Sequence, residues 1–279
     1  MTTPRVFVVR HGETEWSLNG RHTGTTELPL TANGEKRIRA TGRALVGDDR
    51  LIVPRNLAHI FVSPRHRAQR TLELLNLGCK SKYPWQESPS LSQEEKKESD
   101  IRTIASVEVT EDIREWDYGD YEGITSPEIR ELRKKQGLGE WDIWRDGCPG
   151  GESPEQITTR LDRLISTIRE KYHSPCIGKP LSDAPAGDVL LVAHGTSILP
   201  FSHLPIHFPK QMKTNFQGHI LRAFAMRWVG STLQDGPSFL LEAGGVGTLS
   251  YEHKNIHEPA ILLGGGFMVD IMEQDEKKN

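Results

Sequence analysis

The order of apolar and polar residues along the chain predicts buried strands alternating with amphipathic helices. Four apolar runs of strand length are continuous, without the polar alternation typical of a strand with one exposed face. They cover residues 5–9, 58–63, 189–193 and 238–243. Runs of this kind favour strands that are buried on both faces, as in a parallel sheet covered by helices.

Helical patterns lie between these runs. The clearest begins at Ser153, which is followed by a proline at the first helical position and by Gln156, a combination typical of a capped helix start. An apolar stripe then recurs at 157, 161, 164, 165 and 168. Further helices are expected at 64–75 and 126–135. The alternation predicts an α/β fold, a three-layer sandwich in which a mainly parallel central sheet has helices on both faces.

The chain has 279 residues, of which 35% are hydrophobic, enough for one domain with a sizeable core. We expect a single domain over 1–270, a polar and exposed excursion at about 79–105, and a disordered tail at 271–279. No internal repeat is evident.

Composition narrows the functional classes. A net charge of −3 gives no general attraction for nucleic acid or anionic membranes, so neither is expected as a partner. Three scattered cysteines argue against a disulfide scaffold and against a thiolate zinc site. The pattern of a signal peptide and apolar runs of spanning length are both absent from the sequence. We therefore expect a cytoplasmic protein.

Unusual polar residues follow three of the apolar runs. Arg10-His11-Gly12 follows the first, Ser63-Pro64-Arg65-His66-Arg67 the second and His194-Gly195 the third. In open α/β sheets the ligand crevice lies beyond the carboxyl ends of the strands, so these residues should converge. A single histidine there is more often a structural residue, but histidines and arginines at three strand ends suit a phosphoryl group, because the arginine fork matches phosphate oxygens.

In chain order, "VVRHGETEW", "SPRHRA", "REWDYGDYEG" and "VAHG" resemble the histidine phosphatase superfamily, also called phosphoglycerate mutase-like, over most of the chain. The segments at 112–123, 143–153 and 239–260 resemble its fungal sedoheptulose-1,7-bisphosphatase branch. The last segment discriminates best, because phosphoglycerate mutases have no similar stretch.

The resemblance implies catalytic roles. His11 would be the nucleophile that becomes a phosphohistidine, which splits one hard displacement into two. Arg10 and Arg65 would bind the phosphoryl oxygens, and His194 would donate to the same group. Glu115 would protonate the leaving oxygen and then activate water, a task that needs a raised pKa; its alternative is an ordinary loop carboxylate.

The resemblance also implies substrate contacts. Thr23 and Gly24 would bind the substrate, and Tyr118 would touch the sugar. Arg133 is a candidate for a distal phosphate, with an exposed helix position as the equally weighted alternative. Gly247 either lets the backbone approach the substrate or makes a turn. The scheme needs no metal and no cofactor, and His253 and His257 are set aside as metal ligands. Oligomeric state is open, with a homodimer as one alternative.

One departure from the family pattern follows Gly195. The expected continuation "HILRAFAMRW" appears only at His219, and removal of the 23 residues 196–218 would restore it. The extra segment holds prolines at 200, 205 and 209 and has no convincing amphipathic period. It is interpreted as an atypical insertion, either a retained intron translated in frame or a genuine lid loop.

The function expected from the resemblance is a metal-independent phosphatase that acts on a small phosphosugar, namely sedoheptulose 1,7-bisphosphate, through a phosphohistidine. Within enzymes the alternative is a phosphoglycerate mutase or a broad phosphomonoesterase. From another class, the chain could be a phosphate-binding protein whose catalysis is impaired because the insertion misplaces His194.

Overall fold

The computed structural model describes residues 1–86, 98–180, 182–195, 219–236 and 239–267. Within these ranges one mixed sheet has the strand order β3-β2-β4-β1-β5-β6. β3, β2, β4 and β1 are parallel, β5 runs antiparallel to β1, and β6 runs antiparallel to β5. The strands are β1 (Val6–Arg10), β2 (Leu57–Val62), β3 (Ser106–Val109), β4 (Asp188–Ala193), β5 (Val246–Tyr251) and β6 (Pro259–Phe267).

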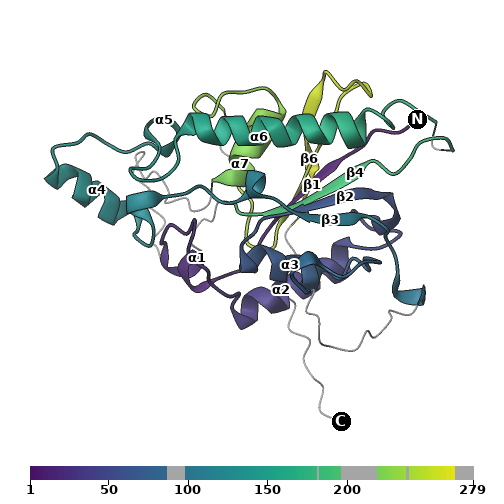
Figure 1. Cartoon of the computed structure of the whole chain (residues 1–279), viewed down its shortest axis with the longest axis horizontal. Helices are drawn as coiled ribbons and strands as arrows, with labels where there is room; N and C mark the ends of the chain where they lie inside the picture. Colours follow the sequence, from purple (N-terminus) through teal and green to yellow (C-terminus); the bar gives the residue numbers. More distant parts are fainter. Residues whose placement is uncertain (87–97, 181, 196–218, 237–238, 268–279) are drawn as a thin grey trace, which may run out of the picture.

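Helices cover both faces of the sheet, so the predicted α/β sandwich with a mainly parallel sheet is confirmed (Figure 1). α2 and α3 lie on one face, and α6 and α7 lie on the other. The helices are α1 (Glu15–Asn19), α2 (Ala32–Leu45), α3 (His66–Leu75), α4 (Ser126–Lys135), α5 (Ile143–Asp146), α6 (Pro154–Ile168) and α7 (Ile220–Trp228).

The strands build two hydrophobic cores by strict alternation. Val6 and Val8 of β1 belong to the core beneath α6 and α7, whereas Phe7 and Val9 belong to the core over α2 and α3. Successive side chains of a strand point to opposite faces, so a strand between two cores must be apolar at every position. This explains the continuous apolar run of β1, all of whose residues are buried.

The helix starts follow their capping residues. Ser153 caps α6 in a capping box with Gln156, as its sequence predicts. α4 spans the predicted 126–135 and is capped by Thr125. α3 begins at His66, two residues later than expected, because its N-cap residue Arg65 has an extended backbone conformation.

The strand expected at 238–243 is wrong for the residues described, 239–243, which form no strand. The chain turns at Gly244, whose φ of +78° suits glycine, and Gly245 donates back to the carbonyl of Glu242. Pairing with β1 starts only at Val246, where β5 begins.

β3 and β6 were not predicted. Both lie at the edges of the sheet. β3 has four largely exposed residues and a weak apolar signal, whereas β6 contains the apolar run 260–263 and was missed although this signal was present.

Parts of the predicted excursion at 79–105 are better ordered than expected. Cys79 and Tyr83 are buried, and the backbone of Cys79 forms an isolated β-bridge with Thr103 at the other end of the segment.

Residues 87–97 lie outside the described ranges, as do the proposed insertion at 196–218 and the tail at 271–279. In the described part of the chain, every helix is too short or too polar to cross a lipid bilayer.

Candidate active site

The carboxyl ends of three adjacent parallel strands carry the polar residues singled out in the sequence. Arg10 ends β1 and is followed by His11, Ser63 follows β2, and His194 follows β4. All four side chains are buried. Because β2, β4 and β1 are neighbours in the sheet, their carboxyl ends lie side by side, at the end of the strands opposite the N-terminus (Figure 1). The topology therefore produces the convergence that a phosphoryl site requires.

A small pocket opens at the carboxyl ends of these strands. Five of the residues that line it carry charge or a nucleophilic ring: Arg10, His11, Arg21, Arg67 and Glu115. The remaining lining residues are Thr14, Ser17, Thr23 and Gly195. Two buried arginines, one exposed arginine, one imidazole and one carboxyl group thus face a common space.

The contacts of His11 select its tautomer. Its Nδ1 lies 2.7 Å from the carbonyl oxygen of Gly12, which can only accept, so Nδ1 carries the proton. Nε2 then keeps its lone pair for a nucleophilic attack. Burial, followed by the nearby Arg67 and Arg10, lowers the pKa of His11 well below its ordinary value. The ring is therefore neutral at neutral pH, as a nucleophile must be.

His194 lies beside His11, with the ring centroids 5.0 Å apart. Arg67 donates from Nε to His194 Nδ1 at 3.2 Å, so Nε2 carries the proton and donates to Ser63 Oγ at 2.7 Å. The structure thus brings His194 next to the nucleophile. Both of its ring nitrogens contact protein groups, and its side chain is not among the pocket-lining residues.

Arg67 stands in the pocket where Arg65 was expected. The side chain of Arg67 is buried and donates to the carbonyl oxygens of Thr23 and Thr26. Arg65 instead contacts Glu27 at 3.4 Å and does not line the pocket. The helical period is the feature that could have identified Arg67. It places Arg67 on the same helix face as the buried Thr71, four residues on.

The loop that carries Thr23 and Gly24 is held from two sides. The carboxylate of Glu122 accepts the backbone N–H groups of Gly24, Thr25 and Thr26. Arg67 binds carbonyl oxygens of the same loop. Thr23 consequently lines the pocket. Gly24 lies against the carbonyl oxygen of Trp116, and a Cβ at this position would come within 2.2 Å of that oxygen.

Glu115 is 2% exposed and lies against the start of α7. Its Oε1 accepts the N–H groups of Trp116 (2.8 Å), His219 (3.0 Å) and Ile220 (3.2 Å). Burial raises the pKa of Glu115, while the amide donors and Arg67 oppose the rise. A carboxyl group in the pocket with a raised pKa is suited to give and take a proton.

Gly24 does not line this pocket, and three further predicted substrate contacts also lie outside it. Tyr118 is fully buried, with its hydroxyl 2.8 Å from Nδ1 of His219. Arg133 lies on α4 and donates to the carbonyl oxygen of Gly139. Gly247 is inside β5, opposite Val8, and faces a separate groove between α7 and β6.

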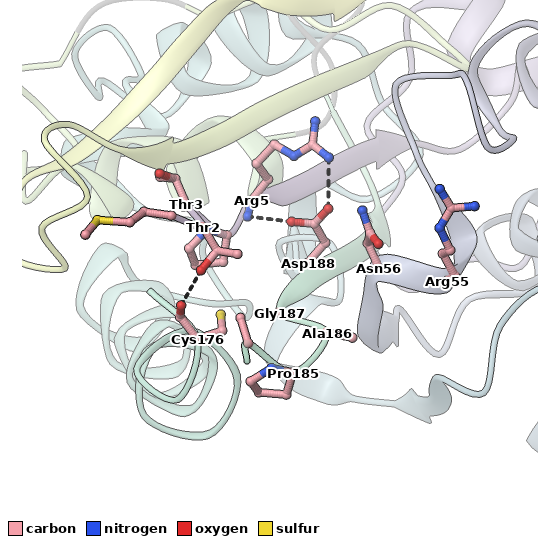
Figure 2. Close-up of a pocket in the computed structure, with 13 residues that line it drawn as sticks. Thr2, Thr3, Arg5, Arg55, Asn56, Cys176, Pro185, Ala186, Gly187 and Asp188 are labelled. Carbon is pink, nitrogen blue, oxygen red and sulfur yellow. Dashed lines mark hydrogen bonds and ion pairs between the residues drawn. The ribbon is translucent and has the colours of Figure 1, made fainter. Parts of the chain in front are cut away.

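A second hollow lies at the amino ends of the strands (Figure 2). Arg5 and Asp188 face each other there, joined by a hydrogen bond from the Arg5 backbone and one from its guanidinium, each 2.9 Å. The Thr2 hydroxyl donates to the carbonyl oxygen of Cys176. These groups bind one another across the hollow, whereas His11 and Glu115 face the open space of the first pocket.

Comparison with known proteins identifies the family of the chain. The family model of the histidine phosphatase superfamily (branch 1) matches residues 6–94 and 98–217. Sedoheptulose 1,7-bisphosphatase of Saccharomyces cerevisiae is 38% identical over 98% of this chain and 97% of its own length. An acid phosphatase of Mycobacterium tuberculosis is 31% identical over 92% of this chain and 91% of its own.

Solved structures show the same fold. The product of an open reading frame of Mycobacterium tuberculosis has a TM-score of 0.60 at 28% identity, with 93% of this chain and 96% of the other covered. A mycobacterial glucosyl-3-phosphoglycerate phosphatase has a TM-score of 0.59 at 18% identity, with 93% and 97% covered. The chain belongs to the histidine phosphatase superfamily and is a phosphoric monoester hydrolase.

Proposed function

We propose that the chain is a sugar-bisphosphate phosphatase that works through a phosphohistidine at His11, without a metal or cofactor, and converts sedoheptulose 1,7-bisphosphate to sedoheptulose 7-phosphate. The observation that carries the proposal is the shared pocket of His11, Arg10, Arg67 and Glu115. A cytoplasmic location is part of the proposal, and a homodimer remains one alternative for the assembly.

In the first half-reaction, Nε2 of His11 attacks phosphorus and the bond from phosphorus to the sugar oxygen breaks. Glu115 gives its proton to that oxygen, so the sugar leaves as an alcohol. Arg10 and Arg67 face the space where the phosphoryl oxygens would lie. Their charges stabilise the negative charge on those oxygens, and burial in a pocket of low dielectric strengthens the interaction.

In the second half-reaction, water attacks the phosphohistidine. Glu115 now takes a proton from the water, the bond from nitrogen to phosphorus breaks, and phosphate leaves with His11 neutral again. Burial favours the neutral ring over the protonated one, because it lowers the pKa of His11. Each group thus returns to its starting protonation state.

The breadth of the match favours a sugar bisphosphate as substrate. The yeast sedoheptulose 1,7-bisphosphatase matches 98% of the chain. A 2,3-bisphosphoglycerate-dependent phosphoglycerate mutase of Cytophaga hutchinsonii is 30% identical and covers only 69% of this chain. A role for Arg133 at the distal phosphate remains a prediction, since its guanidinium also lies 3.7 Å from Asp146.

The test is phosphate release from a panel of sugar bisphosphates, with and without a chelator. We expect hydrolysis of sedoheptulose 1,7-bisphosphate, unchanged by the chelator, and a labelled phosphohistidine that disappears in His11→Ala. Transfer of the label to a second phosphosugar instead of water would indicate a mutase. Binding of inorganic phosphate without any phosphohistidine would indicate the noncatalytic alternative. Either result overturns the proposal.

A further inference from the structure

His219 connects the start of α7 with the residue that we assign as the proton donor. Its backbone N–H lies 3.0 and 3.1 Å from the two carboxylate oxygens of Glu115. Its ring nitrogen Nδ1 lies 2.8 Å from the hydroxyl of Tyr118. One residue thus contacts the acid through its backbone and a buried tyrosine through its side chain.

The ring of His219 is enclosed on several sides. Its centroid lies 5.2 Å from that of Trp144, 5.8 Å from that of Tyr118 and 5.9 Å from that of His22 in a stacked arrangement. The residue is 5% exposed. A buried ring with this packing and a hydrogen bond has few alternative rotamers, so it holds its own backbone in place.

We propose that His219 is a positioning residue, which holds the first amides of α7 against Glu115 through the hydrogen bond of its ring to Tyr118. The inference rests on the proposed function, because it deepens the role of Glu115. It also gives Tyr118 a role different from the expected sugar contact. Loss of the ring contact would loosen the first turn of α7 and remove amide donors from the carboxylate.

Several other groups also set the charge of Glu115. Arg10 at the end of β1, Arg67 on α3 and Arg160 on α6 favour its ionised form, and the thiol of Cys148 lies close enough to interact with it. Burial opposes ionisation. Because the amide donors favour ionisation, their loss should raise the pKa of Glu115 further.

The experiment uses substrates with different leaving groups. A sugar oxygen needs a proton as it leaves, whereas p-nitrophenolate does not. For His219→Ala and Tyr118→Phe we expect kcat/KM on the sugar bisphosphate to fall by about a hundredfold, and on p-nitrophenyl phosphate by less than about threefold. The alkaline limb of the sugar-bisphosphate pH profile should move to higher pH. Equal losses on both substrates would overturn the inference.

A matched control is available in the second buried tyrosine–histidine pair. The Tyr251 hydroxyl lies 2.7 Å from His173 Nδ1, away from the pocket. Tyr251→Phe should lower thermal stability without changing the leaving-group dependence or the pH profile. A change of that dependence in Tyr251→Phe would overturn the inference, because loss of any buried pair would then produce the effect.

A titration separates this inference from the proposed function. Carbon-13 NMR of labelled glutamate follows the Glu115 carboxyl group whether or not the chain turns over a substrate. We expect the pKa to rise in Tyr118→Phe, and an unchanged pKa would overturn the positioning role even in an active enzyme. A wild-type chain without phosphatase activity would overturn the proposed function alone.

Discussion

At the scale of single residues, the site depends on which cations are held inside it. Arg67 is 1% exposed and is fixed through its guanidinium to His194 and to the loop carbonyls of Thr23 and Thr26. It is therefore oriented before any substrate arrives. Arg65 is joined to Glu27, so part of its charge is neutralised outside the pocket.

The two arginines should consequently differ in a kinetic comparison. We expect Arg67→Ala to lower kcat/KM by about 10² to 10³, as the loss of one fixed donor to a developing anion commonly does. Arg65→Ala should stay within about fivefold of wild type, because an exposed ion pair has little effect. Steady-state hydrolysis measures both. A larger loss for Arg65→Ala would show that Arg65 is the phosphoryl ligand.

The sequence identified the site residues that directly follow strands, but it did not identify the pocket arginine that lies in a helix. His11 and His194 follow buried strands directly, so topology alone places them at one edge. Arg67 lies inside α3, which begins at His66. The helical period places Arg67 on the same face as Thr71, but the sequence alone does not show that this face is buried against the site. Glu115 came only from the family resemblance, because its loop has no periodicity.

At the scale of elements, α7 starts in the register that an uninterrupted chain would have. The N–H of Leu221 donates to the carbonyl oxygen of His194 at 3.0 Å. If residues 196–218 were removed, Leu221 would be the fourth residue after His194, which is the spacing of an α-helical hydrogen bond. Strand β4 and helix α7 thus already have the relative placement of a direct connection.

Removal of 196–218 should therefore preserve the site. We expect the shortened chain to be at least as active as the full one. It should also gain about 2 to 3 kcal/mol in free energy of unfolding, because a shorter loop costs less entropy to close. Steady-state kinetics and thermal unfolding test this, with Tm expected to rise by several degrees. Lower activity together with a lower Tm would contradict the argument.

A register control accompanies the deletion. In the shortened chain, one alanine inserted between Gly195 and His219 would rotate α7 by about 100° relative to the strand, or strain the junction. This variant should lose the amide contacts to Glu115 and most of its activity. Equal activity of both shortened chains would mean that the register of α7 does not matter to the site.

The elements that the sequence predicted are those buried on both sides. β1, β2 and β4 lie between two cores, so nearly every position is apolar and the run stands out. The exceptions are Arg10, His59 and Asp188. β3 has only four residues, mostly exposed, so its pattern is weak. β6 was missed although it carries an apolar run at 260–263. The strand predicted at 238–243 was wrong because Phe239 and Leu241 pack against the core from an irregular segment, and apolar content alone does not distinguish such a segment from a strand.

At the scale of the whole molecule, burial of histidines should make stability depend on pH. Burial lowers the pKa of His22 to about 4 and that of His173 to about 3, and lowers the values of His11, His194 and His219. Unfolded histidines titrate near 6.5. Below that pH the unfolded chain binds more protons than the folded one, so stability falls as pH falls.

Two buried carboxyl groups act in the opposite direction. Burial raises the pKa of Asp188 and of Glu115, so the folded chain takes up their protons first and is stabilised as pH falls. Burial also lowers the pKa of His59. These six histidines outweigh two carboxyl groups between pH 6.5 and about 5, since each histidine contributes up to about 1.4 kcal/mol per pH unit.

Chemical unfolding at a series of pH values measures the balance. We expect the free energy of unfolding to decrease steadily from pH 7 to 5, and the slope to be reduced in His173→Gln, because this variant removes one buried imidazole away from the pocket. His257→Gln is the matched control, since His257 lies in an exposed turn and should leave the slope unchanged. A flat profile in wild type would show that these rings take up protons without cost, and that the neutral state assigned to His11 needs another cause.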